Sequence, residues 1–182
     1  MAISIDDIKK LRAMTGAGLA DVKKALTEAE GDFDKAKELL RERGLAIAAK
    51  RSDRETSNGC VLVKVVDGFA ATIALKCETD FVANGADFIA LTQSILDAAI
   101  AAKAKDLEAV KALDINGQTA QEAVTQRSGI TGEKMELDGY LTLEGDNIEG
   151  YDHMGKHTLC TMVQLNKTLQ RSVTSWLCRL QL

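Results

Sequence analysis

The sequence predicts an α+β protein in which a small three-helix unit precedes a core with an antiparallel sheet packed by helices. Apolar residues recur every three or four positions over the first 44 residues, which is typical of amphipathic helices. After residue 59 the period changes to two, as in strands that bury one face. The expected strands come in runs, and this order favours one sheet covered by helices over alternating βαβ units.

Three short helices are expected in the first unit. Ser4 is placed to cap the first helix, and two aspartates follow it in the first turn, where the helix dipole favours negative charge. Residues 15–18 break this helix, and Gly31 closes the second. Asp32 can cap the third helix, which we expect to stop at Gly44 and to be followed by a separate helical stretch.

A β-hairpin opens the core. Residues 60–66 and 69–77 are rich in apolar and β-branched side chains, and only Asp67 and Gly68 separate them. A two-residue Asp-Gly loop predicts a type I′ turn, in which both central residues have positive φ. Alternation places five side chains of the second strand on one face: Phe69, Ala71, Ile73, Leu75 and Cys77.

Helices follow the hairpin. A long helix is expected at about residues 87–102, because apolar residues recur there with a helical period. A shorter helix is expected near residues 107–113. A capping box at Thr119 begins another helix, which we expect to end before Gly129.

Three more strands complete the expected sheet as a meander. They are expected at residues 135–144, 148–153 and 159–165, where the pattern again favours strands. Alternation in the first of them would put four side chains on one face: Met135, Leu137, Leu141 and Leu143.

Composition and charge exclude several classes of protein. The 182 residues include no proline and 4% aromatic residues, and the formal net charge of −4 arises from an acidic middle region. Few aromatic residues and no concentrated basic face argue against direct nucleic-acid binding. No segment has the length of a membrane span, and the start lacks the pattern of a signal peptide. We therefore expect a cytoplasmic protein with no membrane contact and with reduced cysteines.

Three segments are expected from these patterns. They are a helical unit with its linker at residues 1–54, the α+β core at 55–167, and a divergent tail at 168–182. The tail has no acidic residue and no glycine, and it contains the single tryptophan of the chain. Two explanations are open for the tail: a reading-frame slip, which the nucleotide sequence would reveal, or a genuine variant terminus.

No catalytic group of residues is evident. His153 and His157 are the only histidines, and their spacing of four suits a metal pair only on a helix. Gly155 and the strand context argue against a helix, so structural or surface histidines are the preferred interpretation. Cys160 could complete a site with them, but strand alternation most simply places it in the core. A cysteine or zinc enzyme is the weaker alternative hypothesis.

One short segment admits two interpretations. Asp80 and Phe81 adjoin between a strand and a helix, and Thr79 precedes them. Loops in such positions carry function more often than cores do. In the first interpretation Phe81 is buried beneath the following helix, and Thr79 or Asp80 caps that helix. In the second, Phe81 is an exposed apolar knob beside a carboxylate and acts as an interaction wedge.

Two motifs resemble a known family. The bacterial-type elongation factor Ts family has an amino-terminal signature that is closely similar to residues 11–26, LRAMTGAGLADVKKAL, with further matches at 31–32 and 35–36. Its second signature is similar to residues 77–83, CETDFVA. The motifs stand in the order and at the separation found in the family. The resemblance covers about residues 1–167.

The resemblance implies a guanine-nucleotide exchange factor that acts on elongation factor Tu, in its GDP-bound and nucleotide-free forms, without a cofactor. It implies that the first 54 residues form a ubiquitin-associated-like helical domain that docks on the partner's nucleotide-binding domain. In the family the Asp-Phe pair enters between partner helices near the Mg²⁺ and phosphate site. The matching contact positions are Thr79, Asp80, Phe81 and Val82 in the second signature, Lys9, Arg12, Leu19 and Ala20 in the helical domain, and Thr131, Gly132 and His153 elsewhere.

The chain departs from the family pattern in two ways. Leu19 and Ala20 replace the methionine-type residues that are usual after the Thr-Gly-Ala-Gly loop. Longer members also continue into a second core half that is not visible here, whereas some short members lack it and pair as homodimers.

The competing hypothesis is a protein-binding or chaperone-like module without exchange activity, which would not retain elongation factor Tu.

Overall fold

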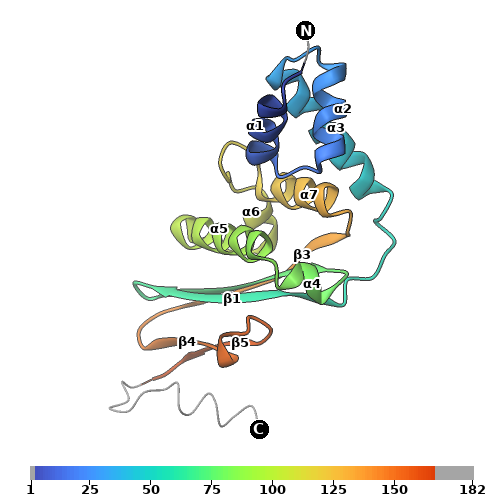
Figure 1. Ribbon diagram of the computed structural model, residues 1–182. Coiled ribbons are helices and arrows are strands. Elements are labelled where there is room, and N and C mark those ends of the chain that lie inside the picture. The colour runs from blue at the N-terminus through green and yellow to red at the C-terminus, as the bar shows by residue number, and fades with distance from the viewer. Residues whose placement is uncertain (1–2, 167–182) are drawn as a thin grey trace. The chain divides into compact units, whose positions relative to one another are not determined.

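The computed structural model describes residues 3–166, and these divide into two compact units (Figure 1). The first unit comprises residues 3–54 and 125–134. The second comprises residues 55–124 and the described part of the chain from residue 135 onward. Helices and antiparallel strands are both present, which confirms the α+β class. The tail at 168–182 lies outside the described residues.

Three helices build most of the first unit. They are α1 (Ile5–Thr15), α2 (Leu19–Glu28) and α3 (Phe33–Ala49). Their inward faces form a small apolar core that includes the fully buried side chains of Leu11, Val22, Ala25, Leu26 and Ala36.

Both predicted helix caps in this unit are confirmed. The Ser4 hydroxyl oxygen accepts a hydrogen bond from the Asp7 amide at 3.1 Å, and the Asp7 carboxylate accepts one from the Ser4 amide in return. The Asp32 carboxylate accepts hydrogen bonds from two amides of the first turn of α3. Each cap satisfies amides that have no partner inside the helix.

Two expected helix ends are wrong. The helix α3 continues through Gly44, and α7 (Ala120–Thr131), whose second half belongs to the first unit, continues through Gly129. The two glycine backbones approach so closely that a Cβ on Gly129 would collide with Gly44 Cα. Glycine costs a helix interior about 0.5–1 kcal/mol relative to alanine. Here it permits a close crossing of two helices and does not stop them.

A three-stranded antiparallel sheet forms the centre of the second unit. Its strands are β1 (Asn58–Val66), β2 (Phe69–Cys77) and β3 (Met135–Glu144), with β2 in the middle. The predicted hairpin is confirmed, because β1 pairs with β2 up to the turn and both Asp67 and Gly68 have positive φ. All five side chains predicted for the inner face of β2 are buried.

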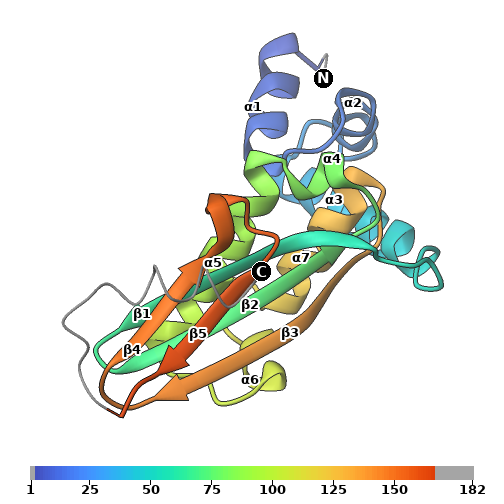
Figure 2. The same cartoon turned by 90° about the horizontal axis from the view of Figure 1, so that it is seen from below.

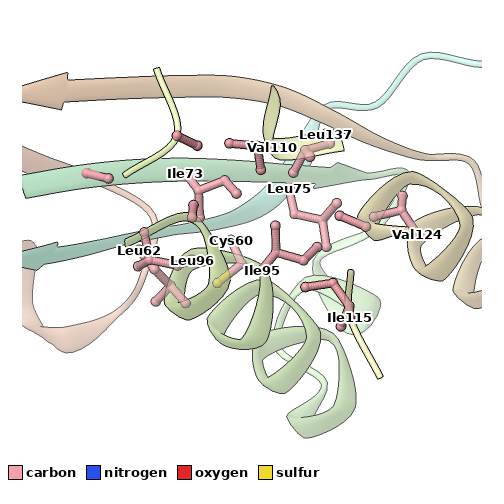
Figure 3. Close-up of a cluster of buried hydrophobic side chains, with 14 of the residues drawn as sticks. Cys60, Leu62, Ile73, Leu75, Ile95, Leu96, Val110, Ile115, Val124 and Leu137 are labelled. Atoms are coloured by element: carbon pink, nitrogen blue, oxygen red, sulfur yellow. The ribbon is translucent and has the colours of Figure 1, made fainter. Parts of the chain in front are cut away.

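Helices cover one face of this sheet (Figure 1). The helix α5 (Ala86–Ala102) packs on β1 and β2, and the short α6 (Leu107–Lys111) packs on β3. Figure 3 shows the apolar cluster between them, where Ile73 and Leu75 of the sheet meet Ile95 and Leu96 of α5. In the described part of the chain, no helix has both the length and the apolar character required to cross a membrane.

The expected single sheet is wrong. The strands β4 (Ile148–Asp152) and β5 (Cys160–Gln164) form a separate two-stranded antiparallel sheet. They lie on the face of the first sheet that α5 leaves open, and they pass in front of β1 and β2 in Figure 2. Gly150 permits this stacking, because a Cβ there would stand 2.8 Å from a methyl carbon of Val63.

The expected face of β3 is also wrong beyond Leu137. The register with β2 shifts by one residue at Asp138, which is a β-bulge. Met135 and Leu137 are buried as expected, but Tyr140 replaces Leu141 on the core side. The side chain of Leu141 is 67% exposed as a result. A simple count of alternating residues assumes an uninterrupted strand and so misses the bulge.

Candidate functional site

The Asp-Phe pair lies on a single helical turn, α4 (Asp80–Ala83), between β2 and α5. Thr79 is the N-cap of this turn, and its Oγ1 accepts a hydrogen bond from the Val82 amide at 3.4 Å. At the other end, Asn84 Nδ2 donates to the Asp80 carbonyl oxygen at 2.8 Å. Thr79 therefore caps this short turn and not the long helix that follows. Side chains close the turn at both ends, which fixes the directions of its residues.

Phe81 is 86% exposed, which decides for the exposed knob over the buried interpretation. The opposite side of the turn is anchored in the core, where Ala83 is buried and Val82 packs against the same cluster. Two residues span about 200° around a helix. Burial of Ala83 therefore directs Phe81 outward, and the carboxylate of Asp80 is exposed beside it.

The segment that leads into α4 is tied to the sheet. The Cys77 thiol, at the end of β2, donates to the Thr79 carbonyl oxygen at 3.2 Å. Asn58 Nδ2, at the start of β1, donates to the Glu78 carbonyl oxygen at 2.9 Å. The aromatic ring thus projects from a short turn whose approach is also held by hydrogen bonds.

A tight turn connects β4 and β5, and it begins with the 3-10 segment η1 (His153–Gly155). His153, expected at the end of a strand, lies in this segment. The Asp152 carboxylate closes the turn: one oxygen accepts from the His157 amide at 3.1 Å, and the other lies 2.5 Å from His157 Nδ1. The His157 carbonyl oxygen accepts from the Val61 amide at 2.6 Å, which fastens the turn to β1.

His153 packs against a neighbouring tyrosine. Its Nδ1 lies 3.2 Å from the Tyr151 hydroxyl, and the two rings meet edge to face with centroids 5.9 Å apart. Between residues 3 and 166, no group of three or more His, Cys, Asp or Glu side chains is arranged to hold a metal ion. The two histidines therefore contact an aromatic hydroxyl and a carboxylate, as structural histidines do.

A cavity of about 600 Å³ lies between α4, the start of β1 and the turn that joins β4 to β5. Its lining combines apolar and polar side chains, among them Cys60, Ala83, Asn84, Ile89, Lys156 and His157. Burial raises the pKa of the Cys60 thiol to about 11 and that of the neighbouring Cys160 thiol to about 12. Both thiols are therefore neutral near pH 7, and neither is poised as a nucleophile.

Four of the predicted contact residues lie on α1 and α2 of the first unit. Lys9 and Arg12 are exposed one turn apart on α1. Leu19 and Ala20 begin α2, and Leu19 is 56% exposed. This places an apolar side chain on the surface directly after the glycine-containing loop between the two helices.

Two more predicted contact residues close α7, in the part of this helix that belongs to the first unit. Thr131 Oγ1 donates to the Arg127 carbonyl oxygen at 3.1 Å. Gly132 ends the helix with a positive φ of 73°. The candidate residues are therefore divided between the two units, with Thr79, Asp80, Phe81, Val82 and His153 in the second.

Sequence reasoning missed Met154. This residue follows His153 in the turn, its side chain is 70% exposed, and its backbone has a φ of 58°. The available signal was a large apolar residue beside Gly155, between two strands. Strand alternation alone does not reveal such a position.

Comparisons with known proteins point to one family. A family model described as Elongation factor TS matches residues 78–178. The chain is 63% identical over 173 residues to an elongation factor Ts from Bacteroides fragilis, covering 95% of this chain and 52% of that protein. It is 60% identical over 169 residues to an elongation factor Ts from Bacteroides thetaiotaomicron, covering 93% of this chain and 51% of that protein. It is 49% identical over 174 residues to one from Porphyromonas gingivalis, covering 95% of this chain and 63% of that protein. The chain spans about half the length of the first two of these relatives.

Proposed function

The chain belongs to the elongation factor Ts family, and we propose that it is a guanine-nucleotide exchange factor for elongation factor Tu. It would bind the GDP-loaded partner in the cytoplasm, promote release of GDP and hold the nucleotide-free form. The observation that carries this proposal is Phe81, a large aromatic side chain that is 86% exposed. It stands beside Asp80 on a capped turn whose other side is anchored in the core.

The proposed activity involves no bond chemistry. An exchange factor binds the nucleotide-free partner more tightly than the loaded partner, and this difference in affinity is all it can use to expel the nucleotide. Full burial of the Phe81 ring in the partner would contribute about 1.5–3 kcal/mol. The Asp80 carboxylate would bring negative charge toward the ligands of the partner's Mg²⁺ and disturb their arrangement.

The remaining contact residues would provide docking. In the first unit, the exposed Leu19 supports a contact with the partner's nucleotide-binding domain, and Lys9, Arg12 and Ala20 lie on the same two helices. We assign Thr131, Gly132 and His153 to further contacts with the same partner. Docking of this kind raises affinity for both states of the partner, whereas the Asp-Phe pair would discriminate between them.

The test is a stopped-flow measurement of fluorescent GDP release from elongation factor Tu, with and without this chain. We expect Phe81→Ala or Asp80→Ala to lower the stimulated rate by about tenfold or more, in line with the contribution expected of a buried aromatic ring. Leu141→Ala is the matched control, because Leu141 is also a large exposed side chain of the second unit. Thermal unfolding of each variant verifies that the fold is intact.

Three outcomes separate the hypotheses. Wild-type rates for the Asp80→Ala and Phe81→Ala double variant would contradict the wedge. Retention of elongation factor Tu without accelerated GDP release would contradict exchange activity and leave a binding module. Failure of the wild-type chain to retain elongation factor Tu would favour a module with a different partner.

A further inference from the structure

Met154 combines two features that the fold of this chain does not explain. Its φ of 58° and ψ of 14° lie in the left-handed region, which is unfavourable for residues other than glycine. Its side chain is also 70% exposed, so most of its apolar surface gains no burial within the described residues. Glycine at this position would relieve the backbone and remove the exposed apolar surface.

The turn that presents Met154 is held by several hydrogen bonds. The His153 amide donates to the Leu159 carbonyl oxygen at 2.9 Å, and the Lys156 amide donates to the His153 carbonyl oxygen at 3.2 Å. The Asp152 carboxylate holds both the amide and the ring of His157. These contacts hold the residues on both sides of Met154, so the methionine is displayed in a defined direction.

The turn borders the same cavity as α4. Residues 155–158 line one side of it, and Ala83 and Asn84 at the end of α4 line another. Phe81 and Met154 therefore extend from two segments that border one opening. Both segments belong to the second unit and lie at the same end of its sheet, opposite the end where the Gly145 amide donates to the Gly68 carbonyl oxygen.

We propose that Met154 is a second apolar contact on the surface that Phe81 begins, and that one face of elongation factor Tu covers both side chains. This inference rests on the proposed function, because it takes the partner of Phe81 as its occupant. The partner face must carry apolar side chains that meet the thioether and span the opening. Burial against it would offset the exposed apolar surface and the unfavourable backbone, which the isolated chain leaves uncompensated. A methionine suits such a contact because its flexible, polarisable side chain adapts to an irregular surface.

The first test measures oxidation of Met154 by hydrogen peroxide, followed by mass spectrometry of its peptide. An exposed thioether oxidises readily, and burial in a complex protects it. We expect oxidation of Met154 to slow by about tenfold when excess nucleotide-free elongation factor Tu is added. Equal oxidation rates in the free chain and in a complex that demonstrably forms would overturn the inference. This measurement uses the wild-type chain and needs no variant to fold.

The second test compares variants by calorimetric titration with nucleotide-free elongation factor Tu. We expect Met154→Gly to weaken binding by about fivefold or more, the loss of a moderate interface contact, with no lower unfolding temperature. We expect Met154→Leu, which keeps an apolar side chain, to bind within about twofold of the wild type. Leu141→Gln is the control at an exposed apolar residue of the same unit, and its affinity should not change.

The outcomes distinguish this inference from the function on which it rests. If Met154→Gly binds as the wild type does while Phe81→Ala is impaired, the exchange proposal stands and the role of Met154 is contradicted. If the wild-type chain forms no complex with elongation factor Tu, both proposals fail together. Impaired binding by Met154→Gly with normal binding by Met154→Leu supports the inference.

Discussion

Phe81 and Leu141 are both large exposed side chains of the second unit, but the backbone exposes them in different ways. Phe81 projects from a capped turn whose opposite side, at Ala83, is buried in the core. Leu141 faces outward because the bulge at Asp138 shifts the alternation of β3 by one residue. Exposure of an apolar side chain therefore does not by itself indicate a contact site. The stronger indication is a set of contacts that fixes the direction of that side chain.

Truncation of Leu137 tests the bulge and has the largest expected effect. Uninterrupted alternation would place Leu137 and Leu141 on the same face of β3, whereas with the bulge Leu137 is 2% exposed and Leu141 is 67% exposed. We expect Leu137→Ala to lower the free energy of unfolding by about 2–5 kcal/mol, because it removes buried apolar surface and leaves a cavity. Urea unfolding measures this change.

The control for this substitution is Leu141→Ala. It makes the same truncation at the exposed leucine on the other side of the bulge. Surface substitutions away from special features change stability by about 0.5 kcal/mol or less, so this variant should unfold nearly as the wild type does. Equal losses of stability in the two variants would show that the bulge does not place Leu137 and Leu141 on opposite faces.

The packing beneath α4 predicts unusually slow alkylation of Cys60. This thiol lines the cavity next to α4, is 1% exposed, and has a pKa raised by burial from 9.0 to about 11. Because this higher pKa leaves less thiolate, the reactive form at pH 8 is roughly a hundredfold scarcer than in a cysteine whose pKa is 9.0. Reaction with iodoacetamide should accelerate as the pH rises toward 11.

Mass spectrometry of the Cys60 peptide, in native and urea-unfolded protein at pH 8, measures this difference. Unfolding restores the ordinary thiol pKa and access, so the unfolded chain serves as the internal reference. Equal rates in the two states would mean that the packing beneath α4 opens freely. Phe81 would then be held no more firmly than Leu141, and the contrast between them would be lost.

Substitution of Thr79 tests whether the cap of α4 matters for presentation of Phe81. Loss of an N-cap side chain costs about 0.5–2 kcal/mol, and on a single turn the cost falls on the turn itself. We expect Thr79→Ala to weaken binding to elongation factor Tu by about fivefold, corresponding to about 1 kcal/mol of reordering on binding. Thr79→Ser keeps the capping oxygen and should behave as the wild type in the same titration. Indistinguishable Thr79→Ala and Thr79→Ser variants would show that the cap is dispensable.

Local signals in the sequence were sufficient for much of the fold. The hairpin follows from Asp67 and Gly68, because a two-residue turn with two positive φ angles depends on the turn residues alone. The continuation of α3 through Gly44 and of α7 through Gly129 could not be predicted, because glycine weakens a helix locally and only the crossing of the two helices explains its presence. The bulge at Asp138 is also a property of the paired strands.

The candidate site was predictable in part. The second family signature identified the Asp-Phe pair, but residue patterns left open whether Phe81 is buried or exposed. That choice depends on which side of a four-residue turn meets the core, and so short a segment has no measurable periodicity. Met154 was not found because its position depends on the hydrogen bonds that Asp152 makes across the turn.

The smallest expected effect is that of Leu141→Thr. Threonine suits an edge strand, and surface substitutions away from special features change stability by about 0.5 kcal/mol or less. We therefore expect unchanged urea unfolding and an unchanged rate of stimulated GDP release. The same replacement at Phe81 should also leave unfolding unchanged, since Phe81 is 86% exposed, yet it should lower GDP release by about tenfold. If Leu141→Thr lowered release to the same degree, the outward face of β3 would belong to the partner surface, and directed presentation would no longer distinguish the two side chains.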